Sequence, residues 1–415
     1  MKIENYKRHG DKLLIALVLV FLAATLYRLL SNETPGKPDV PIPTIVFTQW
    51  WEDSSDKEIF NKLINEFEIL NDNIKIVLNT MTYDDLQRDL FNSDKDLSEG
   101  DSIIIPGDII ALDPLWVPEL LKKEIIEDAH APLVSSINVL YYNIDALKEA
   151  GFLRPPKTRS EFLSYSGTLA GREGNRRASA RGIASSLTMA LKSSRGIYDD
   201  VFPWIWSAGA QLLQDGKPTA NSRPVVESLA FLASMYNEGL IISGPFSVDS
   251  KKKRDDFVSG RVAFMIAPSS DIRLIREHMG DESFGITSIP TPDNYFGKVF
   301  FGTAAWTVGV SAASAYKEEA KRFVDFLTEK AFFLSEQARA IPGNDLSSAQ
   351  DDLYSKVWDI TIAGEIAPDF SGLPWTELEA AFREELATLF AQNSSPADTA
   401  ARIQKRWEDI LERIQ

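Results

Sequence analysis

Cysteine is absent from this chain of 415 residues, and histidine occurs only three times. A chain without cysteine forms no disulfide, offers no thiolate to a metal or a substrate, and cannot carry a lipid on a cysteine behind its leader. The histidines, His9, His130 and His278, are too few and too scattered to indicate a multi-histidine metal site. We therefore expect a protein without a metal or other cofactor.

Positive charge is also scarce. The chain has 44 Lys and Arg against 60 Asp and Glu, a formal net charge of −16 at pH 7. Because nucleic-acid affinity comes largely from basic side chains, this balance argues against nucleic acid as a partner. The basic clusters at 172–181 and 251–254 are expected to be solvated. With 44% apolar and 25% charged residues, the chain is expected to be globular, with two or three cores.

A long hydrophobic run lies near the N-terminus. Residues 1–12 carry Lys2, Lys7, Arg8 and Lys12, and residues 13–30 are almost wholly apolar. As a helix, residues 13–30 would measure about 27 Å, close to the thickness of a bilayer core. The basic flank predicts that residues 1–12 stay in the cytoplasm while the body lies outside, in the periplasm or at the cell surface. We expect an uncleaved membrane anchor. A cleaved leader is the alternative, although Ala23-Ala24-Thr25 is a poor cleavage site.

Residues 31–43 read SNETPGKPDVPIP and contain four prolines. Proline removes a backbone donor and fixes φ, so this segment is expected to be a stiff, extended spacer. The folded body is expected to begin at Thr44.

The first part of the body alternates strands with helices. Thr44–Trp51 is rich in β-branched and aromatic residues, and the Ser55–Glu58 capping box then opens a helix. Strands follow at Ile74–Leu78 and Ser102–Ile105, with a helix from Thr82 between them. The alternation predicts an α/β fold with a parallel or mixed sheet and helices on both faces. Ligands of such sheets bind at the carboxyl ends of the strands.

The rest of the body continues this pattern. Further helices are expected after capping or initiating residues, at Thr158–Glu161, Pro224–Glu238, Lys317–Thr328, Thr376–Glu379 and Ser395–Pro396. Further strands are expected at Val139–Asn143, Val262–Ile266, Phe284–Ile289 and Thr307–Val310.

Five segments resemble a known family. Residues 140–163, LYYNIDALKEAGFLRPPKTRSEFL, resemble its hinge strand and the segment that follows. The other matches, in the same order as in the family, are FEILNDNIKIVLNTMTYDDL, DDFVSGRVAFMI, FGITSIPTP and FFGTAAWTVGVSAASAYKEEAKRFVDFLTEK. Each match alone is weak, but their collinearity across nearly the whole body is specific. The chain is thus similar to bacterial extracellular solute-binding proteins, in the sugar-binding branch that includes maltodextrin-binding proteins.

The resemblance implies two lobes joined by chain crossings near residues 138–143, 289–292 and 342. The first lobe would hold residues 44–137 and 291–340, and the second 138–290 and 341–415. Such proteins close around a ligand by hinge motion. The implied function is that of a monomeric, non-enzymatic binding subunit, which captures a sugar or oligosaccharide and delivers it to the permease subunits of an ABC importer.

Sugar binding needs flat aromatic rings for apolar C–H faces, together with polar groups for hydroxyls. Trp50, Trp51, Glu52 and Asp53 lie where the first strand ends and the first helix begins. Because successive strand residues point oppositely, one tryptophan should face the cleft and the other its lobe. Asp108, after the predicted third strand, is a candidate hydroxyl acceptor. The remaining candidates are Phe202, Trp204, Trp206, Trp306, Trp375 and the pair Ser269–Ser270, where the family often carries a tryptophan.

Other functions remain open from the sequence. A polyamine would suit the acidic charge and the aromatic residues, and the same lobes could serve a tethered sensor without transport. A glycoside hydrolase needs two opposed carboxylates, and the neighbours Glu52 and Asp53 would point apart. Tyr141-Tyr142 could offer phenolates to ferric iron, but by resemblance this pair lies in the hinge strand.

Overall fold

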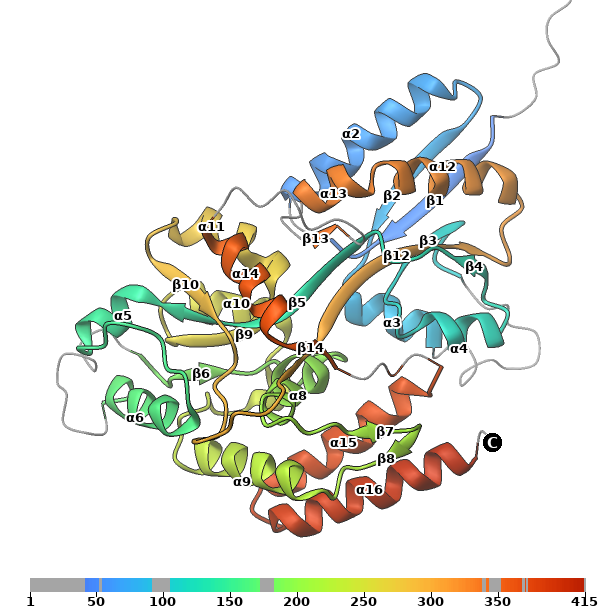
Figure 1. Ribbon diagram of the computed structural model, residues 1–415. Helices are drawn as coiled ribbons and strands as arrows, with labels where there is room; N and C mark the ends of the chain where they lie inside the picture. The colour runs from blue at the N-terminus through green and yellow to red at the C-terminus, as the bar shows by residue number, and fades with distance from the viewer. Residues whose placement is uncertain are drawn as a thin grey trace, which may run out of the picture. The chain divides into compact units, whose positions relative to one another are not determined.

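Two sets of strands meet along two long strands in the computed structural model of this chain (Figure 1). The structure describes residues 42–51, 54–91, 105–171, 183–337, 341–342, 352–367, 370 and 372–413. Within these residues, no helix has the length and apolarity needed to cross a bilayer. The expected anchor at 13–30 and almost all of the expected spacer lie outside the described part.

The first set of strands is built around β1 (Thr44–Gln49). β1 pairs in parallel with β2 (Lys75–Thr80) and β3 (Ile109–Leu112), and β3 pairs antiparallel with β12 (Thr303–Ser311). The helices of this part lie on both faces of the sheet (Figure 1). We call these elements the first lobe; the others are α2 (Ser54–Leu70), α3 (Tyr83–Phe91), α4 (Val117–Lys122), β4 (Ile126–Ala129), α12 (Lys317–Glu329), α13 (Ala331–Gln337) and β13 (Ile341–Pro342).

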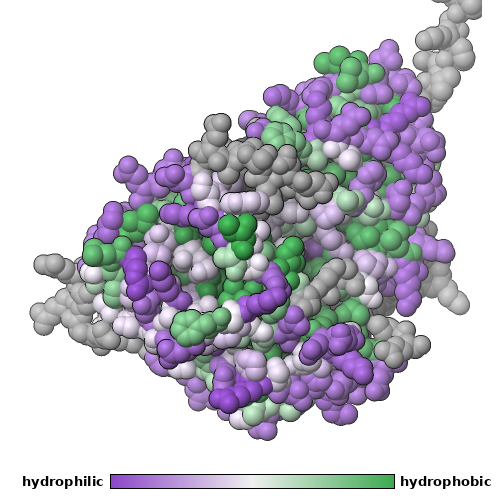
Figure 2. Space-filling model, viewed as in Figure 1, coloured by the Kyte–Doolittle hydropathy of each residue, from purple (hydrophilic) through white to green (hydrophobic). Residues whose placement is uncertain are grey.

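The two faces of the first lobe follow from the alternation of side chains along β3. Ile109 and Ala111 join the core beneath α2 and α12, whereas Ile110 and Leu112 join the core beneath α3. α12 turns Ala320, Phe323, Val324 and Leu327 toward the sheet. The surface over α2 and α12 is accordingly hydrophilic for the most part (Figure 2). The expected sheet with helices on both faces is thus confirmed.

β5 (Val134–Asn143) joins the two sets of strands. Its residues Val134–Ile137 pair with β12, and its residues Asn138–Tyr142 pair with β9 (Phe264–Pro268). β5 therefore changes partners between Ile137 and Asn138. On the returning chain, Gly302 precedes β12, and a Cβ there would meet the Trp206 ring at 2.5 Å. A side chain at this position would push apart the segments with which the chain passes between the two sets of strands.

The second set of strands comprises β9, β6 (Leu187–Thr188) and β10 (Phe284–Thr287), together with the end of β5. We call this part, with the helices around it, the second lobe. Its helices are α5 (Ile144–Glu149), α6 (Arg159–Leu169), π-helix η1 (Ile197–Val201), α8 (Phe202–Trp206), α9 (Arg223–Asn237), 3-10 helices η2 (Pro245–Ser247) and η3 (Ser269–Asp271), α10 (Ser250–Val258), α11 (Ile272–Met279), α14 (Asp352–Ala363), α15 (Trp375–Phe390) and α16 (Pro396–Glu412). Two small sheets complete it, β7 (Leu213–Gln214) with β8 (Lys217–Pro218), and β11 (Phe300–Phe301) with β14 (Glu365–Ile366).

Most of the sequence-predicted elements are confirmed, and the capping residues explain why. Thr158 and Ser395 each accept a backbone N–H at the start of α6 and α16. One prediction is wrong. α15 begins at Trp375 behind Pro374, so Thr376 lies inside the first turn and caps nothing. The expected strand Ser102–Ile105 lies outside the described residues except for Ile105, which is not in a strand, and the next described strand is β3.

A buried ion pair stabilises the second lobe. The Lys253 Nζ donates to both carboxylate oxygens of Asp200, at 2.9 and 3.0 Å, and to the Ile266 carbonyl at 2.8 Å. Asp200 also accepts the Ala190 N–H at 2.8 Å. Burial is the main reason why the pKa of Asp200 is raised to about 6, against the lowering effect of Lys253. Removing one partner would leave the other charge buried alone.

We predict that Lys253→Met destabilises the protein by about 3 to 5 kcal/mol, because it leaves the Asp200 carboxylate buried without a cation. Urea unfolding followed by circular dichroism measures this. Lys251→Met is the matched control, since Lys251 lies on the same helix and pairs only at the surface with Asp255. Equal losses in the two variants would contradict the role of the buried pair.

Candidate functional site

The carboxyl ends of β1 and β3 carry the first group of candidate residues. Trp51 turns into the first-lobe core, with its ring centroid 5.3 Å from those of Phe60 and Trp306. Trp50 packs instead against Tyr83 at 5.3 Å and Trp116 at 5.6 Å. The two indoles thus contact different partners, as alternation along a strand requires. Trp50 stays partly exposed at the carboxyl edge, where a ligand of a parallel sheet is expected.

Asp108 lies at the opposite edge of the same strands. Its carboxylate accepts the Val46 N–H at 2.8 Å and the Ser314 hydroxyl at 2.6 Å, next to the start of β3. The prediction placed Asp108 after a strand, whereas the structure places it before one. Both carboxylate oxygens serve to fasten the amino edge of the sheet.

Asp113 occupies the position that the sequence assigned to Asp108. It directly follows β3 and is only 2% exposed. One carboxylate oxygen accepts the Leu115 N–H at 2.9 Å, and the other accepts the Tyr83 hydroxyl at 2.8 Å and an N–H of Arg195. Burial and the adjacent Asp113 carboxylate raise the pKa of Tyr83 well above its ordinary value, so Tyr83 keeps its proton as the donor. The available signal was the apolar run Ile109–Leu112 followed directly by this aspartate.

Arg195 reaches Asp113 from the second lobe. Its Nε lies 3.2 Å from Asp199, its Nη2 donates to the Thr303 carbonyl at 2.7 Å, and its guanidinium carbon lies 4.6 Å from the Tyr198 ring centroid. Burial alone would lower the pKa of Arg195, but the two carboxylates outweigh it and hold this pKa well above the ordinary value. A buried arginine with these partners stays charged. Asn138, at the point where β5 changes partners, donates to Asp199 at 3.0 Å.

α15 supports the loop that carries Arg195. Arg383 donates to the Ser193 carbonyl at 2.8 Å and pairs with Glu379 at 2.5 Å. Glu379 also accepts the backbone N–H of Ile197. Burial raises the pKa of Glu379 to about 7, although Arg383 lowers it. The loop from Ser193 to Ile197 is thus held by a buried carboxylate that titrates near neutral pH.

The other predicted aromatic residues lie behind this group rather than at a surface. These residues are at most 3% exposed, and three of them pack around Tyr198 and one another. Trp204 packs instead against Phe231, and Trp306 against Phe60 in the first-lobe core. Tyr198 lies 5.0 Å from Trp206 and 5.6 Å from Trp375, so the cluster supports the residue on which Arg195 stacks. The buried residues are Phe202, Trp204, Trp206, Trp306 and Trp375.

Ser269 and Ser270 lie at the end of β9, close to the crossing of the chain. Ser269 is buried and accepts the Ile137 N–H at 3.3 Å, and Ser270 donates to the Ser136 hydroxyl at 3.4 Å. Glu52 and Asp53 lie outside the described residues. In the part of the chain that the structure describes, no group of three or more His, Asp or Glu side chains is placed to hold a metal ion.

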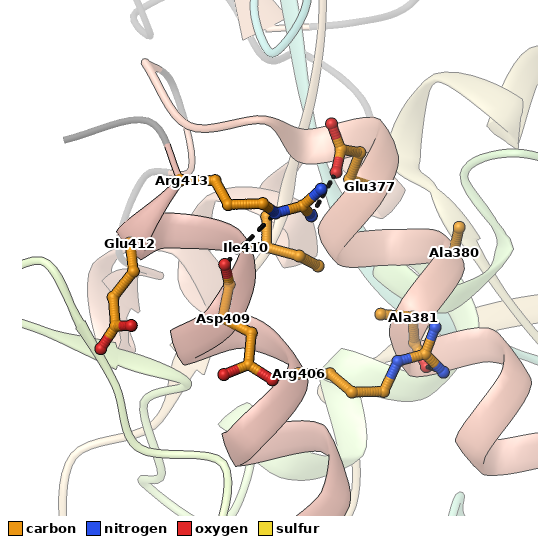
Figure 3. Close-up of a pocket in the computed structure, with 8 residues that line it drawn as sticks. All are labelled: Glu377, Ala380, Ala381, Arg406, Asp409, Ile410, Glu412 and Arg413. Carbon is orange, nitrogen blue, oxygen red and sulfur yellow. Dashed lines mark hydrogen bonds and ion pairs between the residues drawn. The ribbon is translucent and has the colours of Figure 1, made fainter.

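A separate groove of about 660 Å³ lies between α15 and α16 (Figure 3). Its apolar lining residues are Ala380, Ala381 and Ile410, and Arg413 pairs with Glu377 at 2.9 Å. Arg406, Asp409 and Glu412 complete the lining. The groove shares no lining residue with the group around Asp113 and Arg195.

The fold and the group between the lobes define a class, that of two-lobed α/β binding proteins. The sequence of residues 51–331 matches the family described as bacterial extracellular solute-binding protein. This chain belongs to that family.

Curated relatives cover part of the chain. A presumed binding protein of Brucella abortus (strain 2308) is 23% identical over 280 residues, which are 64% of this chain and 63% of the relative. A presumed ABC transporter-binding protein of Deinococcus radiodurans is 27% identical over 207 residues, 48% of this chain and 46% of the relative. The match thus spans less than two thirds of the length of these relatives.

Solved structures share the fold over most of the chain. The GacH receptor of Streptomyces glaucescens, described unliganded and with acarbose, has a TM-score of 0.73 at 15% identity, covering 89% of this chain and 98% of that chain. Maltose-bound MalE3 of T. maritima has a TM-score of 0.72 at 17% identity, covering 88% and 99%. A substrate-binding protein of Listeria monocytogenes, in complex with cycloalternan, has a TM-score of 0.70 at 14% identity, covering 90% and 99%.

We predict that the stability of the protein falls as pH rises from about 4.5 to about 7, in part because of Glu379. The folded state raises the pKa of this carboxyl from 4.5 to about 7 and so binds its proton more tightly than the unfolded state does. This contribution is fully present below the unfolded pKa and is lost as pH rises through the folded one. Urea unfolding should show that the free energy of unfolding of Glu379→Gln falls less than that of the wild type between pH 4.5 and 7. The expected difference is about 1 to 3 kcal/mol. Glu377→Gln, an exposed change on the same helix, should keep the wild-type profile, and an unchanged profile in Glu379→Gln would contradict the assignment.

Proposed function

We propose that this protein captures a sugar or oligosaccharide between its lobes and delivers it to the permease of an ABC importer. The observation that carries the proposal is the group at the carboxyl edge, in which the Trp50 indole, the Tyr83 hydroxyl and the Asp113 carboxylate face Arg195 of the other lobe. An indole ring can stack on the C–H face of a sugar, and the polar groups can bind its hydroxyls. Similar structures are described with acarbose, maltose and cycloalternan, which supports this ligand class.

The residues have two proposed roles. The ligand contacts, as the lobes open and close around it, are proposed to come from Trp50, Tyr83, Asp113 and Arg195. Glu52 and Asp53, which follow Trp51 in the sequence, are proposed as further contacts. Ser269 and Ser270 contribute hydroxyls at the crossing. Trp51, which is partly buried, supports the site from behind together with buried aromatic residues, and Asp108 holds the far edge of the sheet. The buried residues are Phe202, Trp204, Trp206, Trp306 and Trp375.

The lobes are proposed to comprise residues 44–137 with 291–340 and residues 138–290 with 341–415. The pairing of β13 with Val134 and Ser135 favours counting residues 341–342 with the first lobe, as above. The contacts of residues 291–301 favour a later return to the first lobe. Thr291 bridges to Thr158, Asp293 accepts from Ser160, and β11 pairs with β14, all in the second lobe. Gly302 is therefore the favoured point of return.

Two other functions are alternatives to sugar transport: the binding of a polyamine and a role as a tethered sensor. A polyamine is favoured by the two carboxylates, Asp113 and Asp199, that flank the site beside aromatic rings. A tethered sensor would use the same site without a permease, and a deletion strain that keeps its sugar uptake would favour it. We propose no catalysed reaction for either lobe.

A thermal-shift screen tests the ligand class. We expect maltodextrins, but not spermidine or putrescine, to raise the melting temperature, because a ligand at about 100 times its Kd adds about 2.7 kcal/mol to the stability of the native state. Trp50→Ala should abolish the shift. Trp358→Ala is the control, since Trp358 is a partly exposed tryptophan on α14. A shift with polyamines alone would overturn the sugar proposal.

The proposed location is extracytoplasmic, with residues 13–30 as an uncleaved anchor and residues 31–43 as spacer. Mass spectrometry of the protein extracted from bacterial membranes should find the N-terminal residues still attached. A mature chain that starts after about residue 25 would contradict the anchor and favour a cleaved leader.

A further inference from the structure

Three carboxylates surround Ser194 and Arg195 at the candidate site. The backbone N–H and the hydroxyl of Ser194 donate to Asp84 of α3, at 2.8 and 2.6 Å. Arg195 pairs with Asp113 and, at 3.2 Å, with Asp199. The three carboxylates come from α3, from the residue after β3 and from η1, so only the fold brings them to one dipeptide.

Within the described residues, a single cation balances these three carboxylates. Arg195 pairs with Asp113 and Asp199, whereas no described basic side chain pairs with Asp84. The other ion pairs described above, in the second-lobe core and on α15, are each neutral and do not alter this balance. An excess of two negative charges therefore remains around Arg195. Like charges repel one another most where little water reaches them, so this excess is costly unless a cation offsets it.

A polar atom beside these carboxylates also lacks a partner. The amide nitrogen of Asn138 donates to Asp199 at 3.0 Å. This bond fixes the orientation of the amide, because a flipped amide would set its oxygen against the carboxylate. In the part of the chain that the structure describes, the amide oxygen has no hydrogen-bond partner, although Asn138 is only 2% exposed. Since a buried acceptor without a donor costs free energy, this position favours a ligand that donates hydrogen bonds.

We propose that the ligand of this site carries a protonated amine and is therefore an amino sugar. This assignment rests on the sugar-binding function proposed above and specifies its ligand class. An ammonium group supplies a positive charge and three N–H donors, and it has no acceptor. It therefore suits the carboxylates of Asp84 and Asp199 and the amide oxygen of Asn138 better than a neutral hydroxyl does. The Trp50 indole can hold the sugar ring, and an indole face also attracts a cation.

The excess charge acts on the selectivity between sugars. A neutral sugar leaves the negative charge in a site from which water is partly excluded, whereas an ammonium group offsets part of it. Neutral maltodextrins should therefore bind, but less tightly than an amino sugar of the same length. Spermidine brings positive charge but no ring face for Trp50, so charge alone should not suffice.

Two tetrasaccharides provide a matched pair of probes. The β-1,4-linked tetramers of glucosamine and of glucose differ only at C2, which carries an amine in the first and a hydroxyl in the second. Isothermal titration calorimetry of the full chain, at low salt and at a pH that keeps the amines protonated, should show about tenfold tighter binding of the glucosamine tetramer. The difference should shrink as salt rises. The N-acetylated tetramer should lose the advantage, because acetylation removes the charge.

Asp84→Asn removes one of the excess charges. The amide oxygen can still accept from Ser194, so the contact is kept while the charge is lost. The preference for the glucosamine tetramer should fall several-fold in this variant and also in Asp199→Asn. Asp85→Asn is the matched control and should keep the preference, since Asp85 lies on the same helix and pairs at the surface with Arg88. Far-ultraviolet circular dichroism and the melting temperature establish that each variant is folded.

Three results would overturn the amine assignment: equal or tighter binding of the glucose tetramer, binding of neither tetramer, or a full preference that survives in both Asp84→Asn and Asp199→Asn. Failure of the sugar function looks different. If maltodextrins raise the melting temperature while the amine assignment fails, the sugar function stands and only the charge requirement is removed. If spermidine alone raises it, the sugar assignment fails and the preference for a cation stands.

Discussion

The hydrogen bonds between β5 and β12 set the position of every group in the candidate site. Ile137 pairs with Thr303, and immediately after this pair β5 leaves β12 and joins β9. This places the Thr303 carbonyl beneath Arg195 and the Asn138 amide beside Asp199. It also aligns the carboxyl edge of β1 and β3 with the loop from Ser193 to Ile197. A change of register in this pairing would move the two lobes past each other and separate Arg195 from Asp113.

The site combines an aromatic group and an ionic group with different physical roles. The indole ring of Trp50 offers apolar area that can bind a ligand whether or not the ligand is charged. The Arg195 side holds buried charges that are stable only when paired, so it controls geometry more than affinity. Glu379 and Arg383 extend this network into α15 and couple the Arg195 loop to the C-terminal helices. Charge near the site is therefore distributed over three separate parts of the sequence.

Local patterns predicted the fold well and the site only in part. Capping residues such as Thr158 and Ser395, and the apolar face of α12, are short-range signals that tertiary packing reinforces. Trp50 was predicted because its strand end could be recognised. Asp113 was missed because the run Ile109–Leu112 was not recognised as a strand, which gave the role of Asp113 to Asp108. Arg195 carries no local signal, since its partner lies 82 residues away and only the fold brings them together. The burial of Trp204 likewise depends on Phe231 of α9, a helix that follows later in the chain.

Hydrogen–deuterium exchange with and without a maltodextrin tests the central claim, that a sugar binds between the lobes at the carboxyl edge of β1 and β3. The account predicts slower exchange on sugar binding in three segments: around Trp50, from Asp113 to Trp116, and from Ser193 to Tyr198. Protection confined to the groove between α15 and α16, or no protection at saturating sugar, would contradict it.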